Sequence, residues 1–341
     1  FGAAGAVFGV SMGAGLAMVL LILIYLVKKP LKEIEGGREE VKSVGNILKR
    51  LIIIALPITI GASVFTLTSV IDLAMIINRL VSAGFSEKEA MVLWGSYSGY
   101  AIPIFNMPST LVSSISISIV PAIAAAYVKQ ETAQAQKITN SALKITTLFA
   151  LPCAVGIALL SSPILKLIYN NANASGTLAI LGYAVIFVAL VLITNSTLQA
   201  MGKVWVPVIN MALGGVLKVI INYFLVGNAD INIQGAPIGT TFCYLLILVL
   251  NLFAIAKEMN IKYDMAGLLI KPLISVAVMA VAVLGVYSAF ADTGRILACG
   301  VPIAAGAIVY IAMIIFTKAL NDDEILMLPK GEKILKLLKR K

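Results

Sequence analysis

Two charged residues stand inside long apolar stretches of the sequence and are the first candidates for chemistry. Asp72 lies in TSVIDLAMIINRL, seven residues before Arg79, and Lys218 lies in GGVLKVIINYF, nine residues before Gly227. Ionisable side chains are costly in a hydrocarbon interior, where they pair with one another or serve transport. At a helical rise of 1.5 Å per residue, both lie about 10–14 Å from the end of their apolar stretch. Equal depth permits an ion pair, which would keep both charges inside a bundle.

Neighbouring polar residues are predicted to complete a node around this pair. Asn222 follows Lys218 by one helical turn, and Thr240 or Thr241 begins the next apolar segment. One interpretation is a buried pair that fixes two helices together. The other is a coupling or gating node whose protonation or pairing changes as the protein moves. The sequence leaves both interpretations open.

The segment GSYSGYAIPIFNMPSTLVSSISISIVPAIAAA is the other polar element. Its three prolines weaken helical hydrogen bonding, which neighbouring hydroxyls or water must then replace. Its polar side chains recur at helical spacing, and we predict that they line a wet cavity; hydrogen bonding between helices is the alternative. The candidate lining residues are Tyr100, Asn106, Ser109, Thr110 and Ser113.

The elements that must position these residues are transmembrane helices. Of the 341 residues, 60% are hydrophobic and 12% are charged, and the mean hydropathy is +1.01. A soluble domain is nearer half apolar and a quarter charged. Runs of about 20 apolar residues recur along the whole sequence, which predicts an all-α integral membrane protein. The predicted spans are 3–27, 51–79, 91–127, 138–169, 177–201, 204–226, 236–257, 267–290 and 296–317.

The basic residues predict the orientation of these spans. With the C-terminus in the cytoplasm, most of the 26 lysines and arginines fall on the inner side, as the positive-inside rule requires. The tail GEKILKLLKRK is predicted to form a basic amphipathic helix that meets anionic lipid head groups. The net charge of +10 is therefore attributed to membrane topology, and we predict no nucleic-acid partner.

Several kinds of site are excluded by composition. The sequence has no histidine, and its three cysteines, Cys153, Cys243 and Cys299, have no paired spacing. A histidine base or a metal site of histidines and cysteines is therefore not available. We predict no metal, no cofactor and no enzyme activity.

Two long stretches carry a resemblance to a known family. The seventh and eighth helices of stage V sporulation protein B and related polysaccharide-biosynthesis flippases are similar to IDLAMIINRL and to LWGSYSGYAIPIFNMPSTLVSSISISIVPAIAAA. Their tenth-to-twelfth-helix region resembles LQAMGKVWVPVINMALGGVLKVIINYFLVGNADINIQGAPIGT. These flippases belong to the multidrug/oligosaccharidyl-lipid/polysaccharide (MOP) exporter superfamily. The resemblance implies the MATE-like fold, with two six-helix lobes around a central cavity and two additional helices after them.

On this resemblance, the predicted spans correspond to helices six to fourteen of the family. Because Phe1 opens directly inside a predicted helix, we expect a fragment in which most of the N-terminal lobe is missing. The implied parts are the last N-lobe helix at 1–27, a cytoplasmic inter-lobe linker at 28–50, a C-terminal six-helix lobe at 51–258, two additional helices at 259–318 and a basic cytoplasmic tail at 319–341.

The resemblance also implies a function in the bacterial plasma membrane. The implied function is that of a lipid-linked oligosaccharide flippase, which we expect to move an undecaprenyl-diphosphate-type cell-wall precursor by alternating access. The expected partners are this lipid-linked glycan, membrane lipids and cell-wall synthesis proteins. A cation-coupled MATE-type drug exporter is the alternative within transport, although such exporters have twelve helices. A non-transporting scaffold for wall synthesis is the alternative from another class.

The resemblance gives the charged pair a further meaning. Sodium-coupled relatives build a cation site from helices seven, eleven and twelve, which match the segments carrying Asp72, Lys218 and Thr240. The lysine departs from that pattern, since a tethered ammonium takes the place of a bound cation. We hypothesise that no sodium binds at this position. The arginines with which lipid II flippases face a diphosphate have no match in the eighth helix of this sequence.

Overall fold

The computed structural model of this chain describes residues 2–27, 44–261, 266–291, 293–317 and 319. The chain divides into two compact units, Phe1–Leu51 and Ile52–Lys341, each of which is described by itself. Every regular element of the described residues is helical. The long helices are α1 (Gly2–Val27), α2 (Val44–Ser82), α4 (Ile102–Val128), α5 (Thr132–Leu159), α7 (Ser175–Ala200), α8 (Trp205–Val226), α9 (Gly235–Met259), α10 (Lys271–Phe290) and α11 (Arg295–Phe316). The short ones are α3 (Glu87–Ser96), α6 (Ser161–Tyr169) and the single-turn segments η1 (Tyr97–Ala101), η2 (Asn232–Gln234) and η3 (Ala266–Ile270).

The predicted membrane spans are present as helices. Seven helical segments within the described residues are long and apolar enough to cross a membrane, and α1 and α2 contain the first two predicted spans. The alternating stretch SISISIV is helical within α4, as expected for a backbone that must satisfy its own hydrogen bonds in lipid. The predicted linker 28–50 is helical from Val44 onward, because VGNILKR continues without a break into the apolar span.

One predicted span is wrong as drawn. Residues 138–169 were expected to form a single helix, but α5 ends at Leu159 and α6 starts at Ser161. The break follows from Pro163, which has no N–H to donate to the carbonyl of Leu159 four residues earlier. At the other end of α6, Asn170 adopts a left-handed conformation that stops the helix.

The third span is a 42-residue helical segment, Glu87–Val128. It begins with a capping box, in which the hydroxyl of Ser86 accepts from the N–H of Glu89 and the carboxylate of Glu89 accepts from the N–H of Ser86. It is interrupted by the π-helical turn η1, where the N–H of Ile102 bonds to the carbonyl of Tyr97. Pro103 follows at once and provides no N–H, which favours this wider turn.

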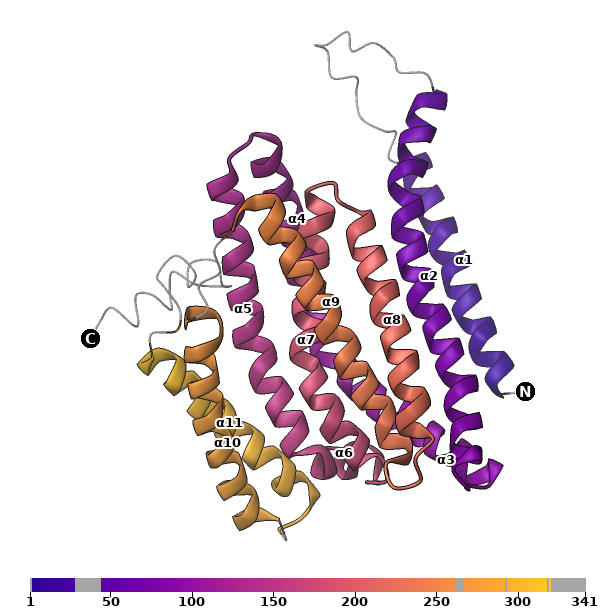
Figure 1. The fold of residues 1–341 in the computed structure, drawn as a ribbon, viewed down its shortest axis with the longest axis vertical. Helices are drawn as coiled ribbons and strands as arrows, with labels where there is room; N and C mark the ends of the chain where they lie inside the picture. The colour runs from indigo at the N-terminus through magenta and orange to yellow at the C-terminus, as the bar shows by residue number, and fades with distance from the viewer. Residues whose placement is uncertain (1, 28–43, 262–265, 292, 318, 320–341) are drawn as a thin grey trace. The chain divides into compact units, whose positions relative to one another are not determined.

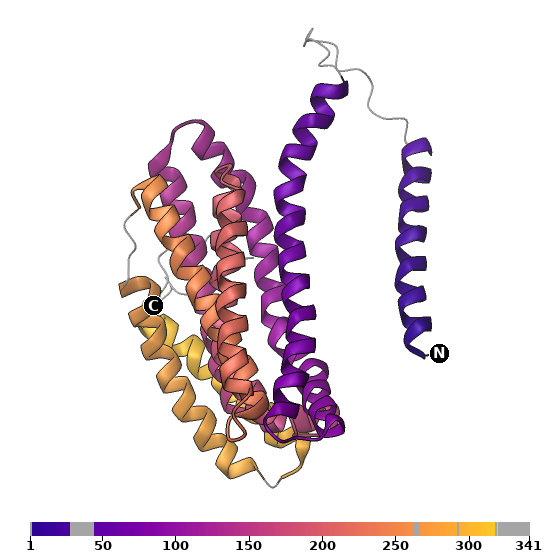
Figure 2. The same cartoon turned by 45° about the vertical axis from the view of Figure 1, so that its right-hand side comes forward.

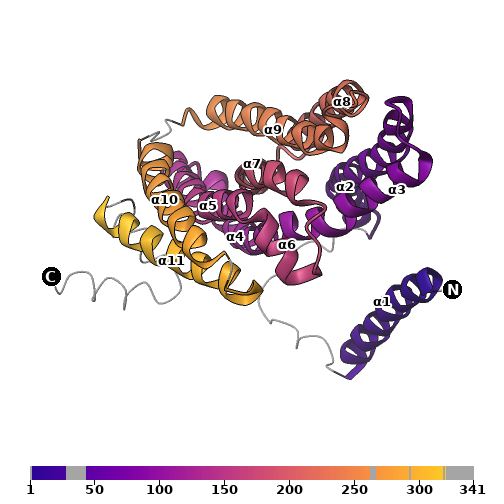
Figure 3. The same ribbon diagram turned by 90° about the horizontal axis from the view of Figure 1, so that it is seen from below.

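Helix α7 is the centre of the second unit. It packs against α4, α5 and α9, and the end-on view shows it between α9 on one side and α4 and α5 on the other (Figure 3). Helices α8 and α9 pack closely along their length (Figure 1). Helices α10 and α11 form a pair that contacts the rest of the unit mainly through α5 (Figure 2).

Ion pairs and cation contacts tie helix ends together. At the end of α2, Nε of Arg79 donates to the carbonyl of Tyr223 on α8 at 3.0 Å, and its guanidinium lies 4.1 Å from the centre of the Tyr223 ring. The opposite end of α8 lies near the end of α9, where Lys203 and Glu258 pair at 2.9 Å. The hydrogen bond that Lys203 donates to Glu258 raises the pKa of Lys203 above its usual value.

The contact between α5 and α7 depends on Gly182. A Cβ added there would lie 2.7 Å from the backbone N of Ala158 and 2.9 Å from the carbonyl O of Ala154. Both neighbours are backbone atoms of α5 and have little freedom to move. The two helices therefore meet through a glycine because no side chain fits between them.

We expect Gly182→Ala to destabilise the protein by about 1–3 kcal/mol, the usual cost of overpacking a tight contact. The measurement is the thermal unfolding midpoint in detergent, which should fall. Gly156→Ala on α5 is the matched control, because a Cβ there meets no described atom within 4 Å. An equal midpoint for the two variants would show that the contact is looser than described.

Candidate functional site

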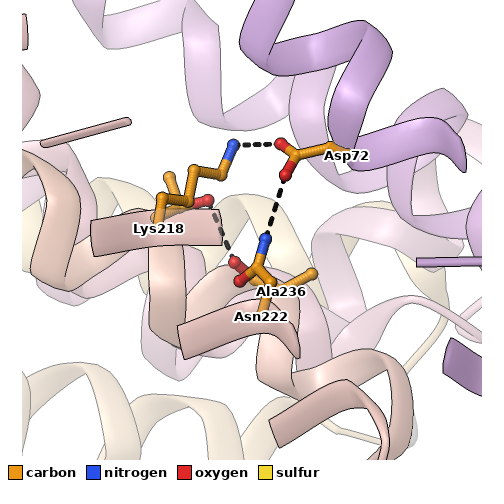
Figure 4. Close-up of polar contacts among 5 residues, drawn as sticks. Asp72, Lys218, Asn222 and Ala236 are labelled. Carbon is orange, nitrogen blue, oxygen red and sulfur yellow. Dashed lines mark hydrogen bonds and ion pairs between the residues drawn. The ribbon is translucent and has the colours of Figure 1, made fainter. Parts of the chain in front are cut away.

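The ion pair predicted from the sequence is present in the structure. Asp72 on α2 and Lys218 on α8 pair inside the second unit, with Nζ of the lysine donating to Oδ2 of the aspartate (Figure 4). The other carboxylate oxygen, Oδ1, accepts from Nδ2 of Asn222 at 3.1 Å. The side chains of Asp72 and Lys218 are 6% and 17% exposed. Both oxygens of this buried carboxylate are therefore satisfied by groups from α8.

The local sequence explains how α8 reaches the carboxylate twice. Lys218 and Asn222 are four residues apart, so their side chains share one face of the helix. Asn222 is fully buried, and a Cβ at Gly239 on α9 would lie 2.0 Å from its Oδ1. Gly215, one turn before Lys218, faces the hydroxyl of Thr68 on α2. Glycines on α8 and α9 thus let three helices close around the pair.

The two threonines predicted for this node bond elsewhere. The hydroxyl of Thr240 donates to the carbonyl of Ala236 at 3.0 Å, and that of Thr241 donates to the carbonyl of Pro237 at 2.8 Å. Both are bonds to the preceding turn of the same helix, a common pattern for hydroxyls inside apolar helices. Thr240 is buried next to the pair. The coupling role assigned to Asp72, Lys218, Asn222, Thr240 and Thr241 stays a prediction.

A cavity of about 250 Å³ opens beside the ion pair. Lys218 is part of its wall, and its buried partner Asp72 is not among the lining residues. Its walls come from α2, η1, α4, α7, α8 and α9, so it lies inside the second unit. The lining residues are Thr68, Ser69, Tyr97, Ile102, Phe105, Asn106, Leu181, Met211, Gly215, Lys218, Thr240, Cys243 and Tyr244.

Of the residues predicted to line a cavity from the third span, Asn106 lines this one. Tyr100 instead packs against Tyr169, with ring centres 4.8 Å apart. The hydroxyls of Thr110 and Ser113 donate to backbone carbonyls three residues earlier in α4. Ser109 has a buried hydroxyl with no hydrogen-bond partner among the described residues. That these four residues line another cavity stays a prediction.

Tyr97 is a site residue that the sequence analysis missed. It is buried in η1, lines the cavity, and interacts electrostatically with Lys218 and Asp72 and through its hydroxyl with Thr240. In a regular α-helix, nine residues rotate the chain by half a turn, which would put Tyr97 and Asn106 on opposite faces. The wider π turn between them changes that rotation. The proline at position 103 is the signal that could have revealed it.

A second polar cluster, also missed, joins α7, α8 and α9. Nδ2 of Asn210 donates to Oδ1 of Asn251 at 2.8 Å, and Nδ2 of Asn251 donates to Thr194 and Asn195 at 3.0 and 2.7 Å. Asn251 and Thr194 are fully buried. Neutral amides bonded to one another tie helices together without placing charge in the membrane interior.

Comparison with known proteins identifies the family. The sequence pattern of the family described as "Lipid II flippase MurJ" matches residues 2–300. The chain belongs to this family. The resemblance to polysaccharide-biosynthesis flippases expected from the sequence is thus confirmed, and the chain is a multi-pass membrane protein of the bacterial inner membrane.

Three proteins similar to this chain show how much of its length is shared with relatives. "Uncharacterized membrane protein YabM" of Bacillus subtilis (strain 168) is 24% identical over 346 residues, which cover 99% of this chain and 64% of the relative. "Stage V sporulation protein B" of the same strain is 19% identical over 96% of this chain and 64% of the relative. "Probable lipid II flippase MurJ" of Rickettsia prowazekii (strain Madrid E) is 31% identical over 125 residues, 36% of this chain and 22% of the relative.

A solved structure supports the MurJ family fold. "Lipid II flippase MurJ, inward closed conformation" superposes with a TM-score of 0.59 at 16% sequence identity, over 82% of this chain and 57% of the other. This match confirms the predicted MATE-like fold, while the division of the chain into lobes stays a prediction. The chain spans 64% of the length of each of the two Bacillus subtilis relatives named above.

The ion pair makes a testable prediction about stability. We expect Asp72→Asn and Lys218→Met each to cost about 3–5 kcal/mol, because each leaves one buried charge without its partner. The double variant should lose less than the sum of the two, since it leaves no uncompensated charge. Unfolding midpoints of all four proteins in detergent measure this coupling. Additive losses would mean that the two side chains do not depend on each other.

The lysine also makes a prediction about sodium. Because Nζ of Lys218 already neutralises Asp72, the unfolding midpoint of the unaltered protein should be the same in sodium chloride and in choline chloride. The Lys218→Met variant should instead have a higher unfolding midpoint in sodium chloride, since the carboxylate of Asp72 has lost its ammonium partner and favours a small cation. A saturable sodium-dependent rise in the unaltered protein that disappears in Asp72→Asn would contradict the hypothesis.

Proposed function

We propose that the chain acts in a flippase for a lipid-linked oligosaccharide, an undecaprenyl-diphosphate-type cell-wall precursor. The observation that carries this proposal is the family match over residues 2–300. Two other findings support it. The fold resembles that of a lipid II flippase, and one relative bears the name of a probable lipid II flippase. The substrate of the family is a lipid-linked glycan, and membrane lipids and cell-wall synthesis proteins are further proposed partners.

The proposed parts of the chain follow the arrangement of its helices. Residues 51–258 are proposed as a six-helix lobe formed by α2, the α3–α4 segment, α5 with α6, α7, α8 and α9. Helices α10 and α11 supply the two additional helices proposed for 259–318. The last N-lobe helix is assigned to 1–27. Most of the proposed linker 28–50 and of the basic tail 319–341 lies outside the described residues.

The proposed mechanism is alternating access, in which helices move relative to one another around a central site. The Asp72–Lys218 pair joins α2 to α8, so separating these helices would expose both charges to an apolar interior. The two helices therefore move together, or the pair exchanges partners when they part. This is why we assign the pair a coupling or gating role.

The proposed orientation places the C-terminus in the cytoplasm, because that places most basic residues on the inner side. The loop that carries Lys203 and the end of α9 lie on one side of the membrane, since Lys203 pairs with Glu258. The end of α2 and the end of α8 share the other side through Arg79 and Tyr223. We propose that a chain with this arrangement of helices acts as a transporter rather than as an enzyme.

The other transport function receives less support. MATE-type drug exporters have twelve helices, whereas α10 and α11 follow the six-helix lobe here. The family match to lipid II flippases also disfavours drug export. A scaffold without transport activity is tested by the experiment below, where an Asp72→Asn protein that still assembles normally but does not restore transport would argue against it.

Depletion of the full-length protein in its own host should make lipid-linked wall precursors accumulate in the cytoplasmic leaflet. The unaltered gene should reverse this, and Asp72→Asn should not, because it leaves Lys218 as an uncompensated buried charge. The measurement is the amount of precursor in each leaflet. Asp230→Asn, the same change on an exposed residue between α8 and η2, is the matched control and should restore transport. An unchanged precursor distribution after depletion would overturn the flippase proposal.

A further inference from the structure

We propose that the cavity beside the Asp72–Lys218 pair binds one uncharged sugar unit. The proposal rests on the proposed function, because the sugar unit would belong to the glycan carried by the lipid. The juxtaposition that suggests it is a set of hydroxyls, an amide and an ammonium around aromatic rings, all within one cavity.

The wall of the cavity carries both hydrogen-bond donors and hydrogen-bond acceptors. The amide of Asn106 donates and accepts, the hydroxyls of Tyr97 and Tyr244 donate and accept, and the ammonium of Lys218 donates only. These groups come from η1, α4, α8 and α9, so several helices contribute to the polar part of the wall. A ligand suited to such a wall carries several groups that also both donate and accept. Hydroxyl groups meet this requirement, and a sugar carries several on one ring.

The aromatic side chains of the cavity suit the apolar faces of a sugar ring. Phe105 and Tyr244 lie next to each other, with ring centres 6.3 Å apart, and Tyr97 also lines the cavity. A sugar presents C–H groups on its faces and hydroxyls around its edge. Small-molecule sites characteristically combine an apolar or aromatic wall with a few placed polar groups that fix the orientation of the ligand.

The charge of the site indicates that the ligand is neutral. The ammonium of Lys218 is compensated by Asp72, so the pair brings no net charge to the cavity. A carboxylate or phosphate that entered would compete with Asp72 for the same ammonium and leave one anion uncompensated. Such a charge is costly in a membrane interior. The cavity therefore favours an uncharged, hydroxylated ligand over an anionic one.

The size of the cavity limits the ligand to about one ring. Its volume of about 250 Å³ is below the ~300–1,000 Å³ of sites that take drug-sized ligands. Water occupies about 30 Å³ per molecule in the liquid, so the space corresponds to about eight waters. Among the wall residues, Ser69 and Asn106 are exposed whereas Tyr97 and Thr240 are buried, so we place the entrance at Ser69 and Asn106.

Two neighbouring threonines provide a matched test. Thr240 and Thr241 both donate to the carbonyl four residues earlier in α9, but only Thr240 lines the cavity. Thr240→Val and Thr241→Val therefore make the same chemical change, inside and outside the proposed site. Asn106→Leu removes a wall amide, and Ser69→Trp places a bulky ring at the exposed rim. None of these variants replaces a residue of the ion pair.

The experiment is saturation-transfer NMR on the purified full-length protein, with glucose and N-acetylglucosamine as neutral probes and glucuronate as the anionic one. We expect the neutral sugars to bind and glucuronate to bind at least several-fold more weakly. Thr240→Val and Asn106→Leu should each weaken binding about threefold to tenfold, the effect of one lost neutral hydrogen bond. Ser69→Trp should abolish it, and Thr241→Val should leave it unchanged.

Three outcomes would overturn the proposal: no binding of either neutral sugar, tighter binding of glucuronate, or equal binding by Thr240→Val and Thr241→Val. The unfolding midpoint of each variant identifies any that fails to fold. This assay involves no transport, so its failure leaves the flippase proposal standing. Sugar binding together with an unchanged precursor distribution after depletion would instead remove the flippase proposal and keep the site.

Discussion

The buried ion pair between Asp72 and Lys218 is the constraint on which the rest of this site depends. Two opposite charges in an apolar interior are stable only when each has its partner in place. The pair therefore fixes the relative depth of α2 and α8, and Asn222 adds a second bond from α8 to the same carboxylate. The glycine at 239 exists for this reason, since any side chain there would displace Asn222.

Helix α8 is held at three levels by contacts of different chemistry. Arg79 meets its last turn, the ion pair holds its middle, and Asn210 bonds to Asn251 on α9 toward its beginning. Met211 connects two of these regions, because it lines the cavity and its sulfur accepts from Asn195 in the amide cluster. A shift of α8 would therefore be felt at the ion pair, in the cavity and in the amide cluster together. This gives the proposed coupling role a physical basis.

The cavity lies beside the same pair. Lys218 forms part of its wall, and Tyr97, Phe105 and Leu181 belong both to this wall and to the hydrophobic core around α7. The clamp and the gating interpretations of the pair then differ in one respect. A clamp needs only the two charges, whereas a node that responds to a ligand needs a space beside them, and this structure has one.

The sequence by itself determined the membrane class, most of the spans and the partnership of Asp72 with Lys218, and its resemblance to known flippases indicated the family. The class, the spans and the pair depend on hydrophobic runs and on the cost of isolated charge, both of which are local properties of the chain. Only the tertiary structure decided that Tyr97 joins Asn106 in one cavity, that Asn251 gathers amides from three helices, and that α5 and α6 are separate. Those outcomes depend on the rotation of a π turn, on the effect of Pro163 and on how closely glycines let helices approach. Helical periodicity predicts the face of a regular helix, and it fails where the helix stops being regular.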